Sequence, residues 1–114
     1  MSLAVAATAL AIVVYPNGVG KPPAQRYALR CAPAAGTVPK PALACRTLAA
    51  LDHPLAPVPP GTTCSQIALG PEEAIVTGRV GGQRLWVRLR VRDSCEIERW
   101  RRIAAVVPGF PGHS

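Results

Sequence analysis

The feature that most constrains the fold of this chain is a set of four cysteines: Cys31, Cys45, Cys64 and Cys95. Zinc sites usually pair ligands two to four residues apart, and no two of these cysteines lie so close together. The histidines, His53 and His113, lie in a proline-flanked segment and near the C-terminus. We therefore predict disulfides and no metal site, and hence a secreted protein from an oxidising compartment. Four cysteines allow three pairings, and their spacing alone does not choose among them.

The length of 114 residues is that of one domain, so we expect a single domain over residues 1–114. Hydrophobic residues make up 49% of the chain and charged residues 17%, which excludes disorder of the whole chain. Aromatic residues make up only 4%, so alanine and aliphatic side chains must build most of the core. We predict that residues 108–114, which are rich in proline and glycine, form a loose tail.

The chain is basic, with 13 lysines and arginines against 6 acidic residues and a net charge of +7. Proteins that bind nucleic acid usually gather cations on one helix or combine them with exposed aromatic side chains. Here the arginines fall mostly on a predicted strand and a predicted terminal helix, with only Trp86 and Trp100 among them. We therefore expect no nucleic-acid partner, and we interpret the arginines of the strand as a solvated surface.

The apolar run from Leu3 to Val14 resembles the hydrophobic part of a signal peptide, but no basic residue precedes it and no Ala-x-Ala site follows. The run is too short to span a bilayer, and we expect no membrane association. Its β-branched end, Ile12 to Val14, precedes turn residues and predicts a buried first strand. The alternative is an atypical leader.

Two more elements follow before the middle of the chain. Residues 26–30 alternate polar and less polar side chains and predict a second strand, and residues 32–40 predict a loop. Pro41 suits the first position of a helix, because its missing N–H would have no partner there. Apolar residues recur at helical spacing from Ala44 to Leu51, so this short helix is expected to bury Cys45.

A hairpin follows the proline-rich segment that leads to Cys64. Residues 74–80 predict a strand, Gly81-Gly82 a tight turn, and residues 84–92 the returning strand. The core-facing residues of the returning strand are Leu85, Val87, Leu89 and Val91. Its outward residues are Arg84, Trp86, Arg88, Arg90 and Arg92. One face of the predicted sheet is therefore apolar and the other basic.

A second helix is predicted to begin near Cys95, with Asp93 or Ser94 as its N-cap, and to run to Pro108-Gly109. Its apolar stripe comprises Ile97, Trp100, Ile103 or Ala104, and Val107. We expect Trp100 in the core. Glu98 precedes Arg102 by four residues, the favourable orientation for an ion pair on a helix surface.

Several segments together carry a resemblance to a known family. They are Leu29-Arg30-Cys31-Ala32-Pro33, residues 36–45, Val76-Thr77-Gly78 and Asp93-Ser94-Cys95-Glu96-Ile97. With this cysteine spacing, the chain resembles the Streptomyces subtilisin inhibitor family over roughly residues 27–103. The resemblance implies an α+β fold, in which a five-stranded antiparallel sheet carries two short helices packed on one face. It also implies the disulfides Cys31–Cys45 and Cys64–Cys95, and inhibition of serine proteases by a substrate-like loop.

The resemblance also places the reactive bond. In the family the scissile bond follows the second residue after the third cysteine, which here is the bond between Gln66 and Ile67. The implied protease-binding loop is Thr63, Cys64, Ser65, Gln66, Ile67 and Ala68. Asp93 stands where the family often has a loop-supporting asparagine, so it is the expected support of the loop. Because Gln66 is uncharged and unbranched, we expect subtilisin-like targets rather than trypsin, whose pocket carries an aspartate.

An enzyme and a binding module are the alternatives to an inhibitor. The sequence has neither a carboxylate pair nor a glycine-rich phosphate loop, so we expect neither an enzyme nor a cofactor. Members of the family pair through their sheets, which allows a homodimer, although an arginine-rich face repels its own copy. The alternative function is a small, disulfide-stabilised, basic binding module for an anionic or protein partner, without inhibitory activity.

Overall fold

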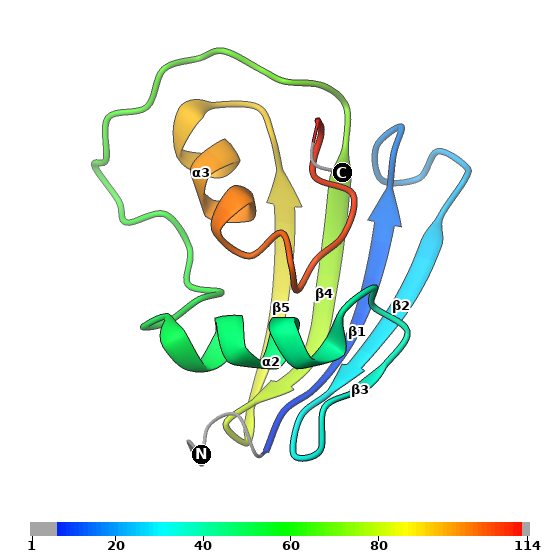
Figure 1. The fold of residues 1–114 in the computed structure, drawn as a ribbon. Helices are drawn as coiled ribbons and strands as arrows, with labels where there is room; N and C mark the ends of the chain where they lie inside the picture. Colours follow the sequence, from blue (N-terminus) through cyan, green and yellow to red (C-terminus); the bar gives the residue numbers. More distant parts are fainter. Residues whose placement is uncertain (1–6, 113–114) are drawn as a thin grey trace.

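The structure, a computed structural model, describes residues 7–112. Five strands form one antiparallel sheet in the order β3-β2-β1-β4-β5, and two helices lie on one face of it (Figure 1). The elements are β1 (Ala9–Tyr15), β2 (Gln25–Arg30), β3 (Ala35–Gly36), α2 (Pro41–Ala50), β4 (Glu73–Val80), β5 (Gln83–Arg90) and α3 (Ser94–Arg102). This arrangement confirms the predicted α+β fold. No helix among residues 7–112 has the length and apolar character needed to cross a bilayer.

The predicted first strand is the central strand of the sheet, β1. Its side chains alternate, and Leu10, Ile12 and Val14 are buried beneath the helices. The earlier part of the apolar run, residues 3–6, lies outside the described residues. On either side, β1 pairs with β2 and with β4, so the apolar run becomes the middle of the core.

Strand β3 lies within a segment that the sequence predicts as a loop. It has two residues, and its pairing places Gly36 opposite Leu29 of β2. The φ of Gly36 is 136°, and a Cβ there would lie 2.1 Å from the carbonyl oxygen of Ala28. Glycine is therefore required for this edge strand to approach β2. A two-residue strand has too little side-chain pattern to be predicted.

Helix α2 begins at Pro41 as predicted and buries Ala44, Cys45 and Leu48. The Cys31–Cys45 disulfide, with a Cα–Cα distance of 5.8 Å, joins the end of β2 to this helix. The disulfide therefore fixes α2 across the sheet.

Helix α3 ends earlier than its apolar stripe predicts, at Arg102 rather than at residue 107. The chain then turns, and the N–H groups of Val106 and Val107 both donate to the carbonyl of Ile103. Trp100 is fully buried, and its Nε1 donates to the carbonyl of Val107 at 2.9 Å. The stripe is therefore buried by a compact turn that folds back beneath the tryptophan.

The predicted loose tail begins just beyond this turn, at residue 108. Phe110 is nonetheless buried, and its ring meets that of Trp100 edge-on, with centroids 6.0 Å apart. Edge-to-face contact between aromatic rings adds to the energy of burial. Residues 113–114 lie outside the described part of the chain.

Glu73 is a buried acidic residue on the sheet face away from the helices, and it is 4% exposed. Its carboxylate accepts hydrogen bonds from Arg88 Nε at 2.7 Å and from the backbone N–H of Val19 at 3.1 Å. Burial by itself raises the pKa of Glu73. The two hydrogen bonds and the neighbouring arginine charges outweigh burial and hold the pKa below its ordinary value.

This lowered pKa predicts a pH-dependent stability. The ionised Glu73 stabilises the fold fully above the unfolded-state pKa near 4.5, and the stabilisation is lost as pH falls through the folded-state pKa. Glu73→Gln is therefore expected to lower the free energy of unfolding by about 1–2 kcal/mol at pH 7, and by less at pH 3. Urea unfolding at both pH values measures this, with the exposed Asp52→Asn as control. Equal losses at the two pH values would contradict it.

Candidate functional site

The candidate site lies in the long connection between α2 and β4, which passes around α3 before it enters the sheet (Figure 1). Its middle part, residues 61–69, is almost entirely exposed. The side chains of Ile67 and Leu69 are 69% and 50% exposed. Large apolar side chains in such positions are available to a partner.

The first attachment of this loop is covalent. The Cys64–Cys95 disulfide, with a Cα–Cα distance of 5.5 Å, joins the loop to the first turn of α3. Both disulfides therefore have the pairing that the resemblance implies. Cys64, Cys95 and Asp93 have ligand atoms within 4.8 Å of one another. The two sulfur atoms are bonded to each other, so this cluster offers no thiolate to a metal.

The second attachment comes from Ser94, the first residue of α3. Its N–H donates to the carbonyl of Ser65 at 2.9 Å, and its Oγ accepts from the N–H of Ser65 at 2.8 Å. Both backbone groups of Ser65 are thus held, directly before Gln66.

Asp93, the support expected from the sequence, has a different contact. Its Oδ1 accepts from the N–H of Glu96 at 2.9 Å and caps α3. Aspartate and serine are both good N-caps, so the sequence left open which of the two neighbours caps the helix. The residue that does not cap, Ser94, is the one that binds the loop.

The third attachment lies beyond the predicted scissile bond. The N–H of Leu69 donates to the carbonyl of Val91, just after β5, at 2.9 Å. Between Ser65 and Leu69, the backbone groups of residues 66–68 have no hydrogen bond within residues 7–112. Three residues are therefore held at both ends, while their own N–H and C=O groups remain available to pair with another chain.

The approach to the loop is fixed as well. Thr62 Oγ1 donates to the carbonyl of Pro59 at 2.7 Å and closes a turn before Cys64. Arg99 of α3 donates to the carbonyl of Leu55 at 3.1 Å, and this bond holds the proline-rich segment beside the helix. Prolines restrict φ, so this segment has few other conformations to adopt.

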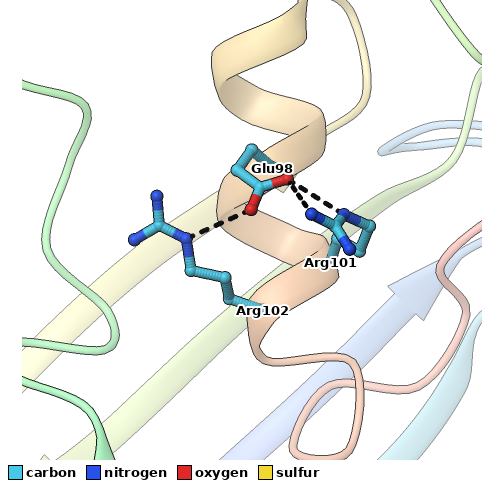
Figure 2. Close-up of polar contacts among 3 residues, drawn as sticks. All are labelled: Glu98, Arg101 and Arg102. Atoms are coloured by element: carbon cyan, nitrogen blue, oxygen red, sulfur yellow. Dashed lines mark hydrogen bonds and ion pairs between the residues drawn. The ribbon is translucent and has the colours of Figure 1, made fainter.

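The exposed side of α3 carries an ion-pair cluster of Glu98, Arg101 and Arg102 (Figure 2). Arg101 Nε lies 2.9 Å from Glu98, and Arg102 Nε lies 3.5 Å from it, so the predicted Glu98–Arg102 pair is present. The hydrogen bond from Arg101 is the main reason that the pKa of Glu98 lies below its ordinary value. Exposed pairs of this kind contribute about 0.3–0.5 kcal/mol each, so they only modestly support the helix that carries the loop.

No protein-family model and no curated protein matches the sequence. Among solved structures, the fold matches that of Streptomyces caespitosus sermetstatin in complex with Bacillus licheniformis subtilisin. The match has a TM-score of 0.57 and 26% identity, and it covers 88% of this chain and 96% of that chain.

The structural match confirms the resemblance to the Streptomyces subtilisin inhibitor family. The similarity extends well beyond the segments that carry the resemblance in the sequence, since it includes most of both chains. The matched protein was crystallised in complex with a protease, and the comparison agrees with the expectation that this chain is not an enzyme.

Proposed function

We propose that this chain is a secreted serine protease inhibitor that presents Thr63 to Ala68 to a protease as a substrate would, with Gln66–Ile67 as the scissile bond. The observation that carries this proposal is the double attachment of an exposed stretch, by Ser94 and Cys95 before the bond and by Val91 after it. The similarity to a protein crystallised with subtilisin supports it. The two disulfides agree with secretion.

The geometry accounts for inhibition by restricting the loop before it binds. A serine protease binds its substrate as extended backbone and places the side chain before the scissile bond in a pocket. A flexible peptide loses conformational entropy when it is ordered in the cleft, whereas a loop held at both ends loses much less. That difference appears as affinity. A protease–inhibitor interface of ordinary size buries about 800 Å² on each partner.

The same attachments oppose hydrolysis. After the serine of the protease attacks the carbonyl carbon of Gln66, the amine of Ile67 becomes the leaving group. The hydrogen bond from Leu69 to Val91 and the core beneath it keep this amine near the acyl carbon. Religation then competes with attack by water, so the complex persists instead of releasing two cut ends.

Titration of subtilisin with the purified protein tests the proposal. We expect loss of protease activity at a one-to-one ratio, and mass spectrometry after long incubation should find slow cleavage at Gln66–Ile67 alone. Rapid digestion throughout the chain would contradict the proposal. Unchanged subtilisin activity in the presence of an excess of this protein would contradict it as well. Those results would favour a binding module without inhibitory activity.

Ser94 gives a sharper prediction about loop support. Ser94→Ala removes the acceptor of the Ser65 N–H but leaves the backbone bond between the same residues. One such hydrogen bond contributes about 1–1.5 kcal/mol, so the inhibition constant for subtilisin should rise about tenfold. Cleavage at Gln66–Ile67 should also become faster. Ser94→Thr, which keeps a hydroxyl, is the matched control, and an unchanged inhibition constant for Ser94→Ala would contradict this role.

A further inference from the structure

The sheet face away from the helices gathers arginines from three strands into rows. The pairing places Ala9 opposite both Arg30 and Arg79, and Arg79 opposite Arg84. Directly paired residues point to the same side of a sheet. The first row therefore contains Arg30, Arg79 and Arg84, with Ala9 between the first two.

A second arginine row lies four residues along each strand from the first. Val13 pairs with Arg26 on one side and with Ile75 on the other, and Ile75 pairs with Arg88. Between the two rows lies a row of Ala28, Ala11, Thr77 and Trp86. Three of these side chains are small, whereas Trp86 is 63% exposed and stands on β5 between Arg84 and Arg88.

The positive charge of this face is mostly uncompensated. Within residues 7–112, Glu73 is the acidic residue of the face, and it already binds Arg88. On this face, the arginines with no ion pair to a described residue are Arg26, Arg30, Arg79, Arg84 and Arg90. The first four are exposed, and Arg90 is half-buried. Arg79 and Arg84 are moreover directly opposite, an arrangement that destabilises a strand pair unless an anion lies between the two charges.

We propose that this face binds single-stranded nucleic acid, with phosphates on the two arginine rows and a base stacked on Trp86. Successive same-face residues on a strand are about 6.6–6.8 Å apart, so the two arginine rows lie about 13 Å apart, with the row of Trp86 between them. The rows can therefore engage phosphates on either side of the base that stacks on Trp86. Stacking on an exposed aromatic side chain supplies binding that tolerates any sequence. A second copy of this chain would bring like charges together and fits less well.

From the sequence alone, no nucleic-acid partner is expected. The sequence showed arginines on one strand, but it did not reveal that β2 contributes Arg26 and Arg30 to the same face. The proposed protease-binding loop is attached to α3, which lies on the opposite face of the sheet (Figure 1). The nucleic-acid site is therefore separate from the inhibitory loop.

Fluorescence anisotropy with a labelled twelve-residue oligothymidylate tests the proposal. We expect affinity to fall steeply with added salt, since phosphate contacts release counterions. Binding should quench the fluorescence of the exposed Trp86. Trp86→Ala should weaken binding of the oligonucleotide about tenfold. Arg84→Glu should weaken binding at least tenfold. The matched control, Arg46→Glu, makes the same charge change on exposed α2 and should have a much smaller effect.

Three results would overturn the proposal, provided that thermal unfolding shows each variant to be folded. The first is no binding at low salt. The second is an equal loss of affinity in Arg84→Glu and Arg46→Glu, which would indicate that net charge alone drives binding. The third is displacement by dextran sulfate together with full affinity in Trp86→Ala. That result would assign the face to a sulfated polysaccharide instead.

Discussion

Replacement of Gln66 by Lys is expected to turn the protein into an inhibitor of trypsin. The aspartate at the base of the trypsin pocket binds a lysine side chain, and a close pair of opposite charges at an interface can contribute about 4 kcal/mol. The dissociation constant for trypsin should therefore fall by about three orders of magnitude. Because Gln66 is exposed and its backbone has no partner among the described residues, the fold should be unchanged.

The measurement is a titration of trypsin activity with the wild-type protein, with Gln66→Lys and with Gln83→Lys. Gln83 is also exposed, and it begins β5, so the second variant adds the same charge away from the loop. Only Gln66→Lys should inhibit trypsin. If Gln66→Lys neither inhibits trypsin nor is cut by it, the scissile bond is not Gln66–Ile67. If trypsin cuts it rapidly and keeps its activity, the loop is a substrate rather than an inhibitor.

Removal of the loop disulfide has the second large expected effect. Cys64→Ala/Cys95→Ala should lower the free energy of unfolding by about 2–5 kcal/mol, because it releases a long loop of the unfolded chain. It should also abolish durable inhibition, since residues before the scissile bond would be held by the Ser65–Ser94 hydrogen bonds alone. The inhibition constant for subtilisin should rise at least a hundredfold.

The other disulfide is a control for stability. Cys31→Ala/Cys45→Ala should also lower the free energy of unfolding by about 2–5 kcal/mol, but the bond lies between β2 and α2, away from the loop. At a temperature where both variants are folded, this second variant should still inhibit subtilisin. Equal loss of inhibition in the two variants would show that overall stability, and not attachment of the loop, governs inhibition.

Much of the fold could be predicted because local patterns agree with the final structure. The alternation along residues 84–92 reflects burial on one face only, and the glycine pair before it fits a tight turn. The start of α2 follows from Pro41. What could not be predicted depends on contacts between distant residues, such as the two-residue strand β3 and the burial of Phe110 against Trp100.

The candidate site shows the same division. The cysteines and the family resemblance predicted the loop that is proposed to bind a protease, because cysteine spacing and short motifs can be read directly from the sequence. The support from Ser94 was missed, since either Asp93 or Ser94 could cap the helix and only the geometry assigns the roles. The arginine rows depend on strand register, which a one-residue shift would reverse, and sequence alone does not fix it.

The isolation of residues 66–68 has a consequence for how such a molecule can diversify. Their backbone groups make no bond within the described chain, and the attachments on both sides use other residues. Exchanges at these three positions should therefore leave folding almost unchanged, and under the proposed function they should change which protease is bound. Libraries randomised there should yield folded members at high frequency, so selection can act on recognition alone.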